Sequence, residues 1–132
     1  MLITELTGKL IGLCMKIHTK IGPACFERVY EEILCYELMR LNLKVDRQCL
    51  LPIQYEDLYI KDAYKLDLLV ENQLIVEVKS VHPLHPVFFI QVHSYLSLLN
   101  LKHGVILNFK VPKMKDGIHR VFNNSGRERI QI

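Results

Sequence analysis

The segment at residues 65–79, with the sequence KLDLLVENQLIVEVK, constrains the fold more than any other part of the chain. It is typical of two apolar strands joined by a tight turn. A turn at residues 71–73 pairs Val70 with Leu74. Because side chains alternate between the two faces of a strand, one face of this hairpin is wholly apolar and must be buried. Its residues are Leu66, Leu68, Val70, Leu74, Val76 and Val78.

The other face of the same hairpin carries charge. The register places Asp67 opposite Glu77, with Lys65 and Lys79 nearby. Directly opposed residues of an antiparallel pair have Cβ atoms about 4.5–5.5 Å apart, so two carboxylates there repel each other. A divalent metal ion held by their oxygen atoms would relieve this repulsion. The hairpin alone leaves a second interpretation open, in which the face is solvated and Lys65 and Lys79 balance the acids.

The composition indicates a single globular domain. The chain has 132 residues, of which 50% are hydrophobic, enough for one core and too few for two. It contains no apolar run of about 20 residues, the length that spans a bilayer, and its N-terminus does not resemble a signal peptide. The four cysteines lack metal-binding or disulfide spacing, which predicts free thiols in a cytoplasmic protein that does not bind a membrane.

The charge distribution bears on possible partners. The net charge of +3 is too small to define a partner by itself. Residues 101–132 contain seven Lys or Arg side chains and only Asp116 and Glu128 as acids. Such a basic segment suits contact with phosphates, and it is equally compatible with an ordinary solvated surface.

The spacing of hydrophobic residues predicts helices and strands that alternate in one α/β domain. Helical spacing extends over residues 4–20, 24–41 and 86–100, and strand-like segments cover residues 44–55, 59–70, 74–80, 104–110 and 118–122. Pro52 indicates that its strand lies at a sheet edge, since proline cannot donate to a ladder. We expect one domain over residues 1–122 and a polar, flexible tail over residues 123–132.

The helices on either side of the hairpin supply further polar candidates. Glu27 lies near the start of the second helix, one turn from Tyr30 and Glu31 and on the same face. An acid near a helix N-terminus also favours the helix dipole, so Glu27 has an ordinary structural explanation. Gln91 and Tyr95 lie four residues apart and therefore share a face of the third helix.

Together these residues resemble the PD-(D/E)XK nuclease superfamily. The pattern Asp67-x9-Glu77-x-Lys79 has the order and approximate spacing of its core motif. The pattern Gln91-x3-Tyr95 is similar to the QxxxY motif that follows the core in RecB-like and phage-exonuclease-like members. The short core pattern occurs widely by chance, so the resemblance depends on its place in a helix–hairpin–helix order.

A closer similarity is to the GxxExxY family of small prokaryotic proteins. Residues 22–32, GPACFERVYEE, resemble its signature, and Asn108-Phe109 resembles its closing strand. The family usually has Gly-Leu-Leu-Glu where this chain has ACFE at residues 24–27, and Leu66 stands where the superfamily motif has proline. Neither departure removes a charged group.

The resemblance implies a restriction-endonuclease-like α/β fold, with a mixed sheet, the hairpin at its centre and helices on both faces. It implies that Asp67, Glu77 and the backbone carbonyl of Val78 hold Mg²⁺ or Mn²⁺, and that Glu27 adds a ligand from the second helix. Lys79 would orient or deprotonate the attacking water, or stabilise charge in the transition state.

The same resemblance implies roles for the third helix and for partners. Gln91 and Tyr95 would position the substrate or the surroundings of Lys79. The substrate would be nucleic acid, with DNA favoured, and the shortness of the chain predicts a homodimer or a partner protein that completes the binding surface. The competing hypothesis is a non-catalytic module of the same fold that binds nucleic acid or a protein.

Overall fold

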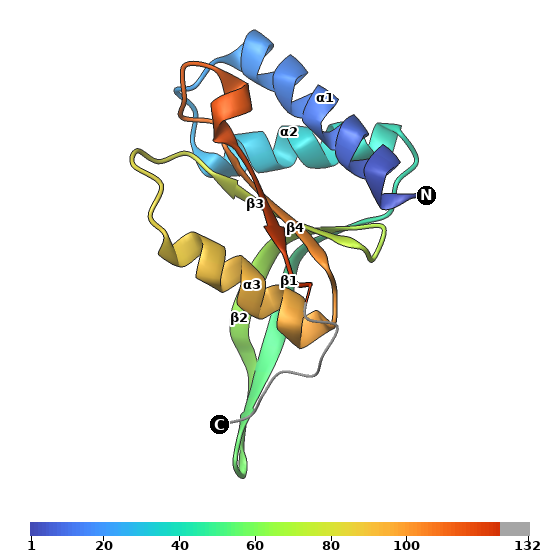
Figure 1. Cartoon of the computed structure of the whole chain (residues 1–132), viewed down its shortest axis with the longest axis vertical. Coiled ribbons are helices and arrows are strands. Elements are labelled where there is room, and N and C mark those ends of the chain that lie inside the picture. Colours follow the sequence, from blue (N-terminus) through green and yellow to red (C-terminus); the bar gives the residue numbers. More distant parts are fainter. Residues whose placement is uncertain (125–132) are drawn as a thin grey trace.

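The computed structural model describes residues 1–124 and contains the helices and strands that the sequence predicts, in the predicted order (Figure 1). They are α1 (Ile3–Ile21), α2 (Glu27–Arg40), β1 (Val45–Tyr55), β2 (Leu58–Val70), β3 (Leu74–Lys79), α3 (Val87–Leu99), β4 (His103–Asn108), the 3₁₀ turn η1 (Met114–Gly117) and β5 (Ile118–Phe122). Within residues 1–124, no helix is both long and apolar enough to cross a membrane. Most of the expected polar tail, residues 125–132, lies outside the described residues.

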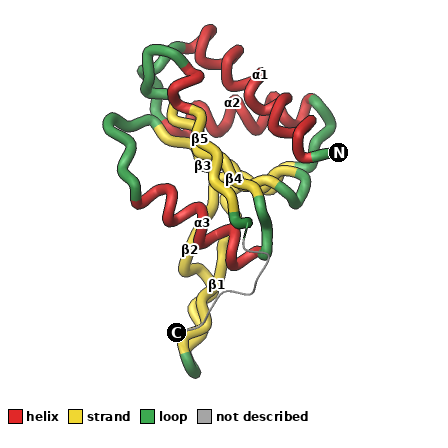
Figure 2. Tube along the Cα trace, viewed as in Figure 1, coloured by secondary structure: helices red, strands yellow, loops and turns green. Residues whose placement is uncertain are grey.

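In the described chain, five strands form one mixed sheet in the order β1-β2-β3-β4-β5. The central strand β3 pairs antiparallel with β2 and parallel with β4, and both outer pairs are antiparallel. A parallel pair needs a crossover connection, which α3 supplies between β3 and β4. Helices α1 and α2 cover one face of the sheet and α3 covers the other (Figure 2). This is the restriction-endonuclease-like arrangement that the sequence predicts.

Two hydrophobic cores lie on the two faces of the sheet. The core under α1 and α2 contains the strand residues Leu68, Val70, Leu74, Val76, Val78, Val105 and Leu107. The core under α3 contains Leu51, Leu66, Ile75, Ile106, Val121 and the helix residues Val92, Tyr95 and Leu96. Since both faces of β3 are covered, every residue of this strand from Leu74 to Val78 is buried, including the acid Glu77.

The predicted register of the central hairpin is confirmed over its paired part. Val70 pairs with Leu74 and Leu68 pairs with Val76, where the pairing of β2 with β3 ends. The prediction that Leu66 shares the face of Leu68 is wrong, because Leu66 packs in the core under α3. Gln48 of β1, which lies between the partners of Leu68 and Leu66, has a φ of 55°, so β1 departs from regular strand backbone beside this change of face.

Beyond Gln48, β1 and β2 continue as a two-stranded ribbon that projects from the body of the molecule (Figure 1). The pairing extends to Tyr55 and Leu58 and shifts register near Pro52. The end of the ribbon is exposed, with Tyr55 and Tyr59 each more than 60% accessible. Pro52 lies in the edge strand β1, as predicted.

Candidate active site

Asp67 and Glu77, which we call the carboxylate pair, lie where β2 separates from β3. The backbone N–H of Asp67 donates a 2.8 Å hydrogen bond to Oε1 of Glu77. The backbone N–H of Val78 donates a 2.8 Å hydrogen bond to Oδ2 of Asp67. Each carboxylate therefore binds a main-chain amide of the other strand just beyond the last backbone pair of the ladder. The structure thus brings together the two acids that the hairpin register predicts to be close.

Both carboxyl groups are held in an environment that disfavours charge. Burial, followed by the charge of Asp67, raises the pKa of Glu77 to about 8. Burial also raises the pKa of Asp67 to about 6, against the hydrogen bond from Val78, which lowers it. Glu77 is only 4% exposed. Two interacting acids of this kind do not both ionise readily near neutral pH unless a cation compensates them.

The oxygen atoms left over by these hydrogen bonds suit a hard divalent cation. Oδ1 of Asp67 receives only a 3.5 Å contact from Gln48, and within residues 1–124 no hydrogen bond reaches Oε2 of Glu77. Carboxylate oxygens are the donors that Mg²⁺ and Mn²⁺ prefer, with waters completing the shell. The described residues contain no set of three His, Cys, Asp or Glu side chains arranged to hold a metal. The donor set therefore fits a cation held by two carboxylates, with the remaining positions taken by backbone oxygen or water.

Lys79 ends β3 on the same strand as Glu77. Its charge lowers the pKa of both acids of the carboxylate pair, which places it within electrostatic range of them. The ammonium Nζ lies 4.1 Å from the centre of the Phe88 ring, over its face. Among the described residues Lys79 makes no ion pair, so its position depends on this cation–π contact from α3. Sequence reasoning did not identify Phe88, because a phenylalanine in an apolar helix carries no signal of such a contact.

The two predicted residues of α3 occupy different environments. Tyr95 is fully buried, and its pKa is raised by burial and then by the charges of Glu77 and Asp67, so it lies beside the carboxylate pair. Its hydroxyl donates a long 3.5 Å hydrogen bond to the carbonyl of Lys65. Gln91 is half-buried, and its side chain makes no hydrogen bond within residues 1–124. Tyr95 therefore forms a wall of the site, whereas the role of Gln91 stays a prediction.

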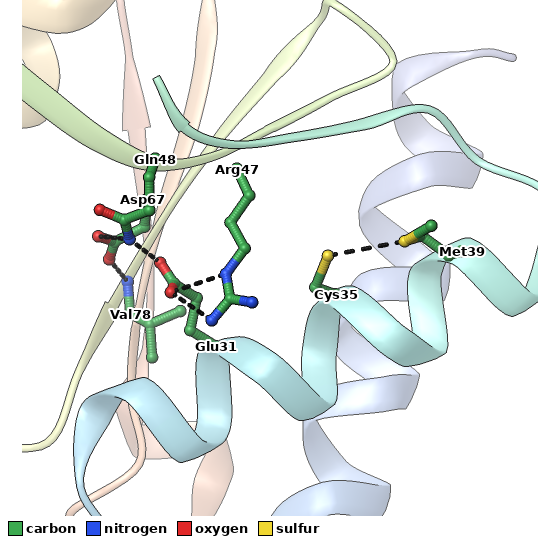
Figure 3. A network of polar contacts seen from close by, with 7 residues as sticks. All are labelled: Glu31, Cys35, Met39, Arg47, Gln48, Asp67 and Val78. Atoms are coloured by element: carbon green, nitrogen blue, oxygen red, sulfur yellow. Dashed lines mark hydrogen bonds and ion pairs between the residues drawn. The ribbon is translucent and has the colours of Figure 1, made fainter. Parts of the chain in front are cut away.

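Two acids of α2 lie near the site, and the one that is linked to the carboxylate pair by hydrogen bonds is Glu31, not the predicted Glu27. Glu27, the first residue of α2, is half-buried and belongs to no three-ligand set in the described chain. Glu31, one turn later, is buried, and Nη2 of Arg47 lies 3.0 Å from its Oε2 (Figure 3). Nε2 of Gln48 donates a short hydrogen bond to Oε1 of Glu31 and lies 3.5 Å from Oδ1 of Asp67. Glu31 is thereby linked to the carboxylate pair.

The left-handed backbone of Gln48 makes this network possible. In a regular strand consecutive side chains point to opposite faces. With a φ of 55° at Gln48, the side chains of both Arg47 and Gln48 reach Glu31 (Figure 3). The sequence did contain one signal for Glu31, namely its place on the same helix face as Glu27 and Tyr30.

Tyr30 and Gly22 of the signature segment have structural roles. The Tyr30 hydroxyl donates a hydrogen bond to the carbonyl of Gly22 and accepts one from the N–H of Cys25 at 3.1 Å. Gly22 has a φ of 81°, a conformation that favours glycine. The Tyr30 ring stacks on Phe109, with ring centres 4.2 Å apart. The connection between α1 and α2 is therefore fixed against the end of β4.

Asn108 holds the segment that follows β3. Its Oδ1 accepts a 3.2 Å hydrogen bond from the N–H of Val81, and its Nδ2 donates a 2.9 Å bond to the Val81 carbonyl. Ser80 Oγ donates a 2.9 Å hydrogen bond to the carbonyl of Cys25. The chain directly after Lys79 is thus fixed by both β4 and the α1–α2 connection.

The Glu31→Gln variant is expected to have an Asp67 carboxyl with a lower pKa than in the wild type. The charge of Glu31 contributes to the raised pKa of Asp67, so removing that charge eases ionisation. Titration of the side-chain carboxyl carbon by NMR in the metal-free protein measures this pKa. The Glu32→Gln variant, altered at the exposed neighbour of Glu31, serves as the control. An Asp67 titration that does not move in Glu31→Gln would show that the two groups are not electrostatically coupled.

The fold and the carboxylate pair define a protein of the restriction-endonuclease-like class. A family model described as the PD-(D/E)XK nuclease superfamily matches residues 4–121. The chain therefore belongs to the PD-(D/E)XK nuclease superfamily. In comparisons with curated proteins and with solved structures, nothing matches it.

Proposed function

We propose that this protein is a metal-dependent nuclease that hydrolyses phosphodiester bonds in nucleic acid, with DNA as the favoured substrate. The observation that carries the proposal is the buried carboxylate pair, whose raised pKa values and unused oxygens suit a divalent cation next to Lys79. Members of this superfamily generally use divalent metals. Mg²⁺ and Mn²⁺ match the all-oxygen donor set.

In this proposal Asp67, Glu77 and the Val78 carbonyl hold the cation, and Glu27 approaches from α2. A bound divalent ion would supply Lewis acidity to the phosphate and lower the pKa of water. Lys79, positioned by Phe88, would orient the water that attacks phosphorus and would offset the negative charge that develops there. The attack forms a phosphorus–oxygen bond with the water oxygen and breaks the bond to the leaving oxygen, which takes up a proton.

Further parts of the proposal concern the substrate and the assembly. Gln91 and Tyr95 would position the strand from the α3 side. The closer similarity to the GxxExxY family and the expected cytoplasmic location belong to the same hypothesis. Most of this short chain is used to build the core, which leaves little surface to bind a duplex. A homodimer or a partner protein is therefore expected to complete the binding surface.

One observation favours the non-catalytic alternative. The carboxylate pair already binds two main-chain amides, so it has a structural use even without a cation. A module of this kind would bind nucleic acid or a protein without cutting. The unused oxygens and the absence of an ion pair at Lys79 in the described chain favour the enzyme.

The test compares cleavage of plasmid, linear duplex, single-stranded DNA and RNA in Mg²⁺, Mn²⁺ or EDTA. Asp67→Asn and Lys79→Ala are expected to reduce the rate at least about a hundredfold, because the first removes a charge that would hold the cation and the second removes the group that would orient the water. Lys61→Ala, on the exposed ribbon, is the matched control and should cut at the wild-type rate. Cleavage that persists in EDTA or in both site variants would exclude the mechanism. Binding without cleavage would favour the module.

A further inference from the structure

A groove with a volume of about 710 Å³ lies between the α1–α2 connection and the ends of β3 and β4. It is formed by residues 23–28, Ser80 and Lys110. Ser80 directly follows Lys79, and the charge of Glu27 is felt by Asp67. The groove therefore adjoins the candidate active site. None of the roles proposed above uses its remaining residues.

Phe26 stands at the rim of this groove in an unusual position. Its side chain is 78% exposed. It occupies the N-cap position of α2 and makes no capping hydrogen bond, although Ser, Thr, Asp or Asn at this position would stabilise the helix. The ring thus contributes neither core packing nor a cap to the fold. An aromatic ring held in water beside a catalytic site is suited to stack on a nucleobase.

The charges around the ring are mainly positive. Arg28 and Lys110 are exposed, and within residues 1–124 neither forms an ion pair. Among the described residues that form the groove, Glu27, whose charge is felt by Asp67, is the one acid. Two unpaired cations in the same groove as an exposed aromatic ring match the phosphates and the base of a single nucleic-acid strand.

The groove is held rigidly relative to Lys79. Ser80 donates a hydrogen bond to the carbonyl of Cys25, which ties the α1–α2 connection to the end of β3; the two lie side by side in Figure 1. Lys110 follows Phe109, whose ring stacks on Tyr30 of α2. A base stacked on Phe26 would therefore lie at a fixed distance from the group that acts on the phosphate.

We propose that this groove binds an unpaired nucleotide next to the phosphate that is cut, with its base on Phe26 and its phosphates near Arg28 and Lys110. This inference rests on the proposed nuclease function and narrows its substrate class. In a continuous duplex the faces of the bases are already stacked on their neighbours. The substrate is therefore a single strand, or a duplex that is locally open at the cut.

The test measures binding separately from cleavage. Fluorescence anisotropy in EDTA reports the affinity for labelled oligothymidylate, oligouridylate, an abasic strand of the same length and a duplex. Phe26→Ser is expected to weaken binding of the two base-containing strands about tenfold, to leave the abasic strand unaffected, and to preserve or raise the melting temperature because serine caps the helix. Tyr36→Ser, at an exposed aromatic residue of the same helix, is the matched control and should bind like the wild type. Lys110→Ala should reduce the slope of log K against log salt by about 0.7 for every single strand.

The outcomes test nucleotide binding in the groove separately from the nuclease function. Three results would overturn the proposal that the groove binds an unpaired nucleotide. They are equal binding by Phe26→Ser and the wild type, tighter wild-type binding to duplex than to single strands, and no binding of any strand. If the wild type nevertheless cuts in Mn²⁺, the nuclease function stands. Binding that depends on Phe26 without cleavage in any metal supports the groove and overturns the nuclease function. A loss confined to oligothymidylate or to oligouridylate supports the groove and shows that it discriminates between these strands, which differ in the sugar and in the 5-methyl group of the base.

Discussion

The Glu77→Gln variant is expected to lose cleavage by about a thousandfold or more and, without metal, to be more stable than the wild type. The substitution removes one of the two charges that would hold the cation, which costs several kcal/mol of transition-state stabilisation. The amide oxygen of the new side chain still accepts the hydrogen bond from the N–H of Asp67, so the local geometry is retained. The gain in stability follows from removing a group that resists ionisation when buried.

The stability effect has a defined direction with pH. Burial and the charge of Asp67 raise the pKa of Glu77 from 4.5 to about 8. The folded wild type therefore keeps a proton that the unfolded chain releases, so this contribution to stability is full below about pH 4.5 and is lost as pH rises through about 8. The Glu77→Gln variant lacks this titration. Its advantage should grow over the same range and reach several kcal/mol, or at least roughly 10 °C in melting temperature, near pH 9.

Thermal unfolding between about pH 5 and pH 9, with EDTA or with Mn²⁺, measures both effects. Mn²⁺ should raise the melting temperature of the wild type most at high pH, where the carboxylate pair is ionised, and should have little effect on Glu77→Gln. Glu32→Gln, altered at an exposed position of α2, should follow the wild type throughout. Equal melting temperatures for Glu77→Gln and the wild type at high pH in EDTA would contradict a buried charge at this position.

The Gly117→Ala variant is expected to lose about 3 kcal/mol or more of unfolding free energy, with a fall of roughly 10 °C in melting temperature. A Cβ atom at this position would lie 1.9 Å from the carbonyl oxygen of Asn108 and 3.0 Å from Cγ2 of Val111. The first contact is with backbone of β4, which cannot rotate away as a flexible side chain can. The η1 turn or the end of β4 must therefore shift.

Gly12→Ala provides the control, because a Cβ there meets nothing within 4 Å in the middle of α1. This variant should gain about 0.5–1 kcal/mol from the better helix propensity of alanine. Urea and thermal unfolding compare the two. Since Asn108 also holds Val81 after Lys79, Gly117→Ala should cut more slowly as well. If it unfolded like the wild type, η1 would not pack against β4 as closely as the structure indicates.

The parts of the fold that were predicted correctly depend on local pattern. Alternating apolar residues and a three-residue turn determine the hairpin, and the observed pairing of Val70 with Leu74 matches it. Helical spacing placed α1 and α3 within a residue or so of their observed ends. The start of α2 was predicted three residues early, at residue 24, because the spacing of hydrophobic residues does not reveal that Phe26 has an extended backbone.

The rest of the site depends on features that a sequence pattern does not contain. The unforeseen contact of Gln48 with Glu31 depends on the left-handed backbone of Gln48, and the wrongly placed Leu66 lies beside this residue on the paired strand β2. Glutamine has no particular preference for this conformation, so tertiary packing must impose it. The contact of Lys79 with Phe88 likewise depends on how α3 crosses the sheet, which residue spacing within the helix cannot specify.

The ribbon formed by the ends of β1 and β2 has a consequence for how stability is distributed along the chain. Within residues 1–124 its outer residues, from Pro52 to Ile60, pair only with each other, and no helix covers them. An isolated two-stranded hairpin is only marginally stable in water. The amides of this segment should therefore exchange with solvent through local opening, without unfolding the cores that hold Asp67 and Glu77. The far end of the ribbon can thus change conformation or be cleaved by a protease while the carboxylate pair keeps its geometry.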